Sequence, residues 1–118
     1  MTIALGRNSK WTVRPEHRER VRRMFGEGLG LQWASPAPPV DQFNLGAGSI
    51  GVIYDEEALN EQDARKGAWI ELVVDDPDQV AAALDAAGVE RIEYQDKTHP
   101  YFQVPGGPVF RVAARRMS

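Results

Sequence analysis

The chain has 118 residues, of which 42% are hydrophobic and 26% charged, and its formal net charge at pH 7 is −3. This length predicts one domain, and the composition is that of an ordinary globular protein. The small net charge gives no electrostatic reason to expect nucleic acid or a membrane surface as a partner, and the lack of cysteine excludes disulfides, thiolate nucleophiles and cysteine-bound metals.

The amino-terminal stretch "MTIALGRNSK" has too few apolar residues for a secretory signal. No apolar run in the sequence approaches the roughly 20 residues that a membrane-spanning helix needs. We therefore expect a cytoplasmic protein with no membrane partner.

The first half of the sequence reads as a strand, a helix and three further strands. A short strand over 10–14 leads into a helix over 15–27, and Pro15 suits the first turn of that helix. The apolar stripe of the helix consists of Val21, Met24 and Phe25. Three short strands with turn-rich connections are predicted near 30–35, 41–46 and 49–54.

The same helix contains most of the only markedly basic stretch, "RPEHRERVRR" (14–23), which holds five arginines. Glu16 and Glu19 lie three or four residues before arginines, and this spacing stabilises a helix through ion pairs along its surface. No aromatic-rich RNA-binding motif accompanies the stretch. We interpret it as a solvated helix face and expect no nucleic-acid partner.

The second half repeats this order after a polar segment over 55–67, which can include a short helical turn. Residues 68–74, "AWIELVV", alternate in polarity and predict a strand. A helix over 77–87 follows, with Asp76 as its N-cap and Pro77 in its first turn. Three further strands are predicted near 89–94, 100–104 and 108–114.

An offset of about 59 residues aligns the two halves. It places "FNLGAGSIGVIY" on "FQVPGGPVFRVA", with Phe43 on Phe102 and Gly48 on Gly107. The predicted element order is therefore βαβββ, repeated once. We expect a single domain over 1–118, with module one over 1–54, a linker over 55–67 and module two over 68–118.

This order and three motifs resemble the vicinal oxygen chelate superfamily, which includes glyoxalase I, bleomycin-resistance proteins and extradiol dioxygenases. "PGGPVFRVA" (105–113) is similar to its closing strand, "MFGEGLGL" (24–31) to the end of its first helix, and "GAWIELVVDDPDQVAAALDAAGV" (67–89) to its fifth strand and second helix. The resemblance covers nearly the whole chain. It implies an α+β fold in which two βαβββ modules form facing curved mixed sheets around a cavity, with the helices outside.

The resemblance also implies four metal-ligand positions, on the first and last strands of each module, which are His, Glu or Gln in metal-using members. In this sequence they fall on Lys10, Val52 (or Gly51 in a slipped register), Trp69 and Arg111. None of these side chains offers a lone pair to a metal, and Arg111 would repel a cation. A first strand that begins near Ile3 would move the first position to Asn8, and one amide assembles no site. We therefore expect no divalent metal cofactor.

The same resemblance places aromatic and polar side chains in the cavity: Lys10, Trp33, Trp69, Glu71, Tyr101, Gln103 and Arg111. Such a lining suits a small aromatic or anionic organic molecule, because rings stack on Trp and acids pair with cations. We expect Glu71 and Arg111 to be close neighbours, since a carboxylate–guanidinium pair satisfies both groups. We also expect a homodimer, because members of the superfamily commonly pair their modules across subunits.

Glu71 and His99 are the candidate catalytic residues. Glu71 lies two residues beyond Trp69 on the same strand face, and the histidine side chain titrates near neutrality, where a general base is effective. Three functions therefore remain open. They are metal-free binding of a small molecule, a lyase or isomerase of the glyoxalase type with a displaced active site, and a protein-interaction module with no ligand.

Overall fold

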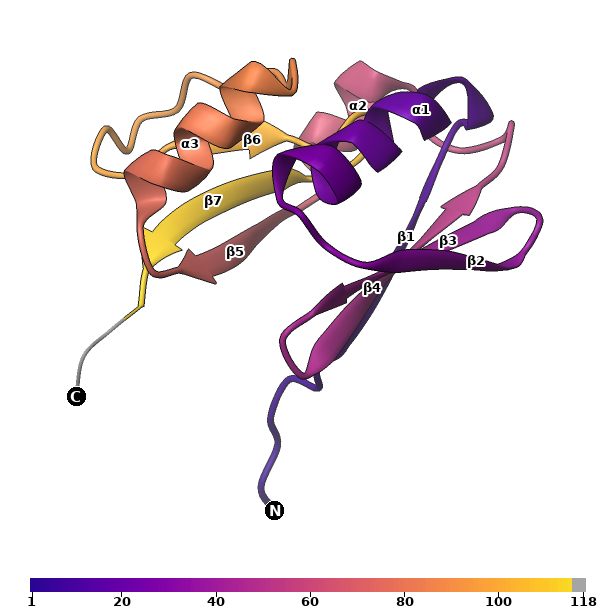
Figure 1. The fold of residues 1–118 in the computed structure, drawn as a ribbon, viewed down its shortest axis with the longest axis horizontal. Coiled ribbons are helices and arrows are strands. Elements are labelled where there is room, and N and C mark those ends of the chain that lie inside the picture. Colours follow the sequence, from indigo (N-terminus) through magenta and orange to yellow (C-terminus); the bar gives the residue numbers. More distant parts are fainter. Residues whose placement is uncertain (116–118) are drawn as a thin grey trace.

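The computed structural model of the protein describes residues 1–115 (Figure 1). The first half contains β1 (Asn8–Val13), α1 (Arg18–Arg22), β2 (Trp33–Ala37), β3 (Val40–Leu45) and β4 (Gly48–Tyr54). The second half contains α2 (Glu61–Gly67), β5 (Trp69–Val74), α3 (Pro77–Ala86), β6 (Tyr101–Gln103) and β7 (Val109–Ala114). A 3-10 turn over Pro15–His17 and a π-helical stretch over Arg23–Gly28 extend α1 at its two ends, so the predicted helix over 15–27 is confirmed.

The strands form two mixed sheets, with the orders β1-β4-β3-β2 and β5-β7-β6. In each sheet the first strand of its half pairs in parallel with the last one, β1 with β4 and β5 with β7. The remaining neighbours pair antiparallel. The fold is therefore α+β, and the two halves share one pairing scheme, as their sequence repeat predicts.

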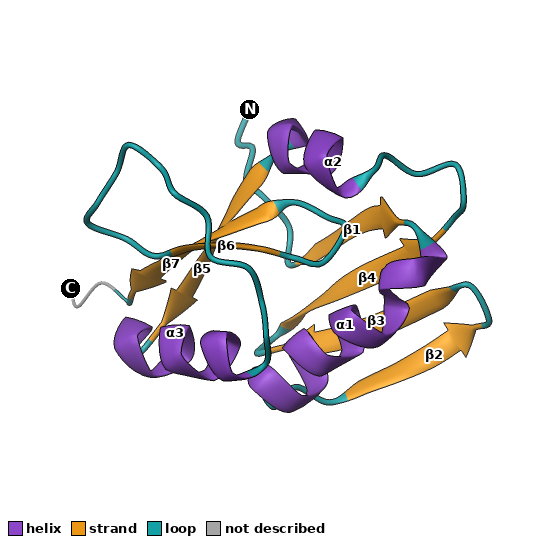
Figure 2. Ribbon diagram, turned by 90° about the horizontal axis from the view of Figure 1, so that it is seen from above, coloured by secondary structure: helices purple, strands orange, loops and turns teal. Residues whose placement is uncertain are grey.

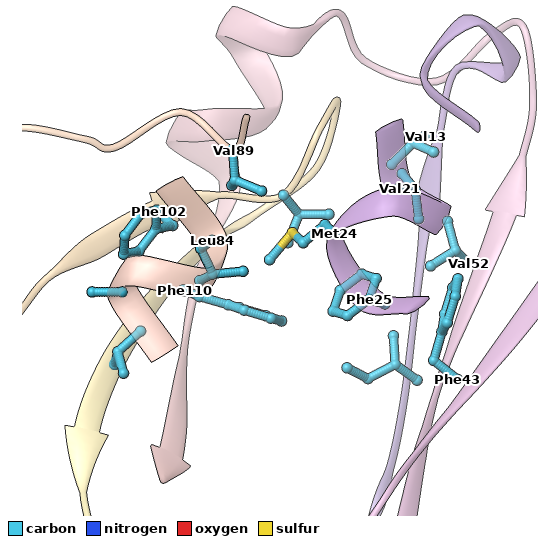
Figure 3. Close-up of a cluster of buried hydrophobic side chains, with 14 of the residues drawn as sticks. Val13, Val21, Met24, Phe25, Phe43, Val52, Leu84, Val89, Phe102 and Phe110 are labelled. Atoms are coloured by element: carbon cyan, nitrogen blue, oxygen red, sulfur yellow. The ribbon is translucent and has the colours of Figure 1, made fainter. Parts of the chain in front are cut away.

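Helices α1 and α3 lie side by side over one face of the sheets (Figures 1 and 2). They approach closely at Gly28, where a Cβ atom would lie 3.2 Å from the Cβ of Ala87. Beneath them, the ring of Phe25 lies 4.8 Å from that of Phe43 and 5.9 Å from that of Phe110. Figure 3 shows these rings among buried side chains from both halves, so one hydrophobic core joins the two modules.

The segment over 89–94 differs from the sequence prediction. It forms a single isolated bridge, at Arg91, and is not a strand, so the second sheet has three strands where the repeat predicts four. Two backbone hydrogen bonds flank this bridge, from the N–H of Ile92 to the carbonyl of Tyr101 (2.8 Å) and from the N–H of Gln103 to the carbonyl of Glu90 (2.9 Å). The pairing ends there, because β6 contains only Tyr101–Gln103 and the connecting loop holds Asp96 and Pro100, which are unfavourable in strands.

The predicted start of α3 is confirmed, and α2 has a side-chain cap as well. The side chain of Asp76 accepts hydrogen bonds from the backbone N–H groups of Asp78 and Gln79, which confirms it as the N-cap of α3. Asn60 caps α2 through its own side chain, so the polar linker does contain a helix. Strand β1 begins at Asn8, between the two starts that the sequence allows. Within residues 1–115, no helix has the length and apolar character needed to cross a membrane.

A buried carboxylate, Asp41 on β3, attaches α1 to the first sheet. It accepts hydrogen bonds from Arg22 Nε (2.8 Å) and from the hydroxyl of Tyr54 (2.8 Å), and the hydroxyl of Ser35 also donates to it. Burial alone would raise the pKa of a carboxyl group. The three hydrogen bonds outweigh that penalty and lower the pKa of Asp41 to about 2.

The Pro-Gly-Gly-Pro turn over 105–108 is buried against the first half of the chain. Gly106 has a φ of +73°, and a Cβ atom there would overlap the imidazole ring of His17. Its N–H donates to the carboxylate of Glu61, at the start of α2 (2.9 Å). Glycine suits this place because both the backbone conformation and the contact exclude a side chain. The turn thereby joins the first half, α2 and the second sheet.

We predict that the free energy of unfolding falls as the pH is lowered from about 4 to about 2. A carboxyl group with a depressed pKa stabilises the folded state above its unfolded pKa of about 4, and this contribution disappears as the pH falls through the folded value. For Asp41, with a folded pKa of about 2, it is roughly 2 kcal/mol. Urea unfolding across this range should give a flatter pH dependence for Asp41→Asn than for the unmodified protein. Equal slopes would contradict this assignment.

We predict that Gly106→Ala destabilises the protein more than Gly46→Ala. Both glycines have positive φ, +73° and +52°, so alanine strains the backbone by about 1 kcal/mol at either position. Only at Gly106 does the new Cβ also meet another side chain, since nothing lies within 4 Å at Gly46. The additional loss for Gly106→Ala should be about 1 kcal/mol or more in urea denaturation. Matching losses would mean that the turn is not packed against His17.

Candidate functional site

Six side chains form a grid on the face of the second sheet that points away from α1 and α3. On β5, Ile70 and Leu72 pack against the core, so Trp69 and Glu71 point to the opposite face. The parallel register sets Trp69 beside Val109 and Glu71 beside Arg111. The antiparallel register of β6 with β7 sets Gln103 beside Val109 and Tyr101 beside Arg111. The two rows of the grid are therefore Trp69, Val109 and Gln103, and Glu71, Arg111 and Tyr101.

Glu71 and Arg111 form the predicted ion pair, which confirms their expected proximity. Arg111 Nε donates to Glu71 Oε2 at 3.1 Å, and Arg111 Nη2 donates to the same oxygen. The guanidinium also lies over the indole of Trp69, with 4.8 Å between its carbon and the ring centroid. Hydrogen bonding to Glu71 and then to Tyr101 raises the pKa of Arg111. The guanidinium of Arg111 thus lies between a carboxylate and an aromatic ring.

The loop between Tyr94 and Tyr101 places His99 next to Asp96. The imidazole Nδ1 lies 2.8 Å from Asp96 Oδ2, and the hydroxyl of Tyr101 donates to that oxygen at 3.0 Å. Thr98 donates to the other carboxylate oxygen from its hydroxyl and its backbone N–H. These contacts, those of Thr98 foremost and that of His99 next, hold the pKa of Asp96 well below its usual range. In neutral His99 the proton therefore lies on Nδ1, which leaves Nε2 as an acceptor.

A groove of about 500 Å³ opens beside this grid. Trp69 and Tyr94 are 48% and 44% exposed, which is unusual for large aromatic side chains, and Val109 beside Trp69 is buried. The ring of Tyr94 is itself supported, 4.8 Å from the ring of Tyr101. We call this hollow the Trp69–Tyr94 groove; its lining residues are Arg65, Lys66, Gly67, Ala68, Trp69, Ile92, Glu93, Tyr94 and Val109.

Gln103 belongs to the grid, but its side chain is 1% exposed and fully engaged. Its amide nitrogen donates to the carbonyl groups of Glu61 (2.7 Å) and Gly107 (3.2 Å). Its amide oxygen accepts from Arg65 Nε at 2.9 Å. Gln103 therefore holds α2 and the Pro-Gly-Gly-Pro turn against the sheet.

The two expected site residues of the first sheet lie elsewhere. Lys10 lines a separate hollow of about 420 Å³, together with Gln42 and Ser49. Trp33 points to the helix side of its sheet, where its ring lies 5.9 Å from that of Phe43 and 4.7 Å beneath the guanidinium of Arg22. The structure thus brings together Trp69, Glu71, Tyr101 and Arg111, and it separates Lys10 and Trp33 from them.

A cleft of about 430 Å³ runs between the two sheets, where the sequence resemblance predicts a cavity. Its apolar walls include Trp11, Ile50, Ile70 and Phe110, and Glu71 lies at its edge. The cleft and the Trp69–Tyr94 groove therefore lie on opposite sides of β5, because alternate side chains of a strand point to opposite faces.

The four positions that the resemblance assigns to metal ligands do not fit a divalent cation. Lys10 is set beside Gly51 in the β1–β4 register, and Val52 lies on the core side. Trp69 and Arg111 stack on each other, and Arg111 is a permanent cation. Within residues 1–115, no group of three or more His, Asp or Glu side chains is arranged to hold a metal ion. These four positions therefore do not supply ligands for a divalent cation.

Sequence reasoning missed Tyr94, Arg65 and Lys66. Tyr94 lies in the segment that was predicted as a strand, and its exposure follows from the absence of that strand. Arg65 and Lys66 lie on α2, where a polar composition predicts only a solvated linker. Their positions beside Trp69 depend on how Gln103 and the turn hold α2, which no local pattern in the sequence indicates.

No family model and no curated protein matches this chain. Solved structures do resemble it. A Bacillus anthracis protein assigned to the glyoxalase family is 16% identical, with a TM-score of 0.74 over 98% of this chain and 99% of that chain. The fosfomycin resistance protein FosX from Mesorhizobium loti is 16% identical, with a TM-score of 0.69 over 99% and 96%.

The bleomycin-binding protein of Streptomyces verticillus, solved with copper(II)-bleomycin, is 15% identical, with a TM-score of 0.68 over 98% of this chain and 100% of that chain. At these identities the likeness concerns the fold. In each comparison the likeness extends over nearly the full length of both chains. The chain therefore has the fold of the glyoxalase and bleomycin-resistance proteins, which belong to the vicinal oxygen chelate superfamily.

Proposed function

We propose that the protein binds a small aromatic or anionic organic molecule, without a metal, in the Trp69–Tyr94 groove. The observation that carries this proposal is the pair of half-exposed aromatic rings that line a cavity together with the buried apolar residue Val109. Its volume of about 500 Å³ lies within the range of small-molecule sites. An aromatic ring placed there would cover apolar surface that Trp69 and Tyr94 now expose to water.

The charges around the groove favour an anionic ligand over a cationic one. Arg65 and Lys66 line one end. Glu93 is the only acidic lining residue, and it pairs with Lys97 at 3.1 Å. Arg111 supports Trp69 from the side of Glu71, and that ion pair is close to neutral as a unit. At the α2 end, Arg65 pairs with Glu90 at 2.9 Å but keeps further N–H donors, and among the described lining residues Lys66 forms no ion pair. The α2 end is therefore the part of the groove that suits an anion.

Structures with the same fold support a small-molecule role. One of them is a bleomycin-binding protein solved with copper(II)-bleomycin, and another is a fosfomycin resistance protein. Those ligands belong to those proteins, and at 15–16% identity they do not identify the ligand of this chain. What they support is the general class of function, the recognition of a small organic molecule.

The proposal includes a homodimer in the cytoplasm. Strands β1 and β5 are the outer strands of their sheets, and the cleft between them has apolar walls that include Trp11, Ile70 and Leu72. Outer strand edges and apolar clefts are surfaces that a second copy of a chain commonly covers.

We predict that 2-naphthoate, a flat aromatic anion, binds to the protein and that Trp69→Ala weakens this binding at least about tenfold. A tenfold loss corresponds to about 1.4 kcal/mol, which is typical of one aromatic contact together with its buried area. Isothermal titration calorimetry measures the dissociation constant directly. Trp33→Ala is the matched control, because Trp33 is 41% exposed but lies on the helix side of the first sheet. Equal losses for the two variants would refute the site.

We also predict that binding of 2-naphthoate does not depend on a divalent metal. Dialysis against EDTA should leave the dissociation constant unchanged, because the ligand contacts only side chains of the groove. Elemental analysis of the purified protein should find less than stoichiometric nickel, zinc, iron and manganese. A stoichiometric metal whose removal abolishes binding would overturn the metal-free proposal.

A further inference from the structure

Helix α2 forms one wall of the Trp69–Tyr94 groove, yet none of its residues is buried. A helix of seven residues is too short to be stable alone in water. Its attachment must therefore come from specific polar contacts. Gln103 of β6 and Glu61 of α2 itself make most of these contacts, and the ion pair of Arg65 with Glu90 adds another.

Gln103 is among the few buried polar residues of the described chain. A buried amide is costly unless its donors and acceptor are paired. Two of its three hydrogen bonds reach α2: the amide nitrogen donates to the carbonyl of Glu61, and the amide oxygen accepts from Arg65 Nε. A hydrocarbon side chain would pack at this position without making either contact.

Glu61 fixes the start of the helix. Its carboxylate accepts from the N–H of Gly106 at 2.9 Å and from Arg20 Nη2 at 3.0 Å. Burial would raise the pKa of this carboxyl group, but the Gly106 hydrogen bond and the charge of Arg20 outweigh it and lower the pKa. The carboxylate is therefore ionised near neutral pH, and α2 is held at its first residue and near its end.

The result is a guanidinium held at the edge of the groove. Arg65 uses Nε for Gln103 and Nη2 for Glu90, each at 2.9 Å. Two of its five N–H donors are thus engaged, and the others remain for a ligand. Lys66 follows it and also lines the groove. Fixing an arginine before binding reduces the conformational entropy that is lost when it pairs with an acid.

We propose that the α2 end of the groove recognises the acid group of an aromatic carboxylate or sulfonate, and that Gln103 is the positioning residue that holds Arg65 in place for it. This inference rests on the proposed small-molecule function of the groove. It adds an orientation to that function: the ring lies between Trp69 and Tyr94, and the acid group points toward Arg65. Gln103 itself does not touch the ligand.

The test compares 2-naphthoate with its neutral analogue 2-naphthamide by isothermal titration calorimetry. The unmodified protein should bind the anion at least about tenfold more tightly than the amide. Arg65→Gln and Gln103→Met should each bring the two dissociation constants within about twofold of each other, with naphthamide binding nearly unchanged. Arg91→Gln is the control, because Arg91 is an exposed arginine that pairs with Asp85 outside the groove, and it should preserve the tenfold preference.

The outcomes separate this inference from the proposed function. If naphthamide and naphthoate bind the unmodified protein equally, the groove binds aromatic molecules but this inference is wrong. If Gln103→Met weakens both ligands to the same extent, Gln103 only supports the fold and is not a positioning residue for Arg65. If Arg65→Gln keeps the preference, Arg65 does not recognise the acid group, and this outcome remains decisive should Gln103→Met fail to fold. If neither compound binds, the proposed function fails together with the inference.

Discussion

The parallel register of β5 with β7 places Glu71 directly beside Arg111, and the candidate site depends on this pairing. A shift of one residue would turn Ile70 and Leu72 toward solvent and bury Glu71 in the core. The hydrophobic pattern of β5 prevents that shift, because its alternate residues pack under α3 and against the aromatic core. The ion pair then supports Trp69 from one side. Thus the burial of one strand face determines the chemistry of the other.

A second constraint is the buried turn between β6 and β7. Gly106 packs against His17 of the first half, and Gln103 and Glu61 connect the same turn to α2. These polar contacts lie next to the shared core of Phe25 and Phe110. The hydrophobic contacts of the core join the two halves but have no preferred geometry. Hydrogen bonds do have one, so they fix the position of α2 on the sheet. The shape of the groove is therefore determined by polar contacts that the hydrophobic core alone would not specify.

Much of this architecture could be predicted from the sequence, because it follows from local rules. The alternation of residues 68–74, the cap at Asp76 and the repeated element order all have a fixed spacing along the chain. The pairing of Glu71 with Arg111 also followed, once both strands were assigned to one sheet. The rest depends on contacts between distant segments. The sequence places Trp33 in a strand but does not indicate which face of the sheet it occupies. Only its packing against Phe43 determines that face.

The same reasoning explains why Tyr94 was missed. The segment 89–94 has a suitable composition, but it pairs with β6 only briefly, through the bridge at Arg91 and two backbone hydrogen bonds, because β6 itself has only three residues. The length of β6 is in turn limited by Pro100 before it and by the turn after Gln103, which α2 and His17 hold in place. The loss of one strand exposes Tyr94 beside Trp69 and so creates the wall of the groove.

The charges of the second sheet determine what the groove can select. At one of the positions where the resemblance implies a metal ligand, Arg111 adds a positive charge, and Glu71 largely cancels it at short range. The Arg111–Glu71 ion pair therefore does not attract a cation, and it attracts an anion only weakly. Selectivity for an acid must therefore come from other groups of the groove. These are Lys66 and the N–H donors that Arg65 keeps beside its ion pair with Glu90. A permanent cation at Arg111 makes that position unsuitable for a metal ion, and the polar attachment of α2 holds the groups with which we propose that a negative group binds.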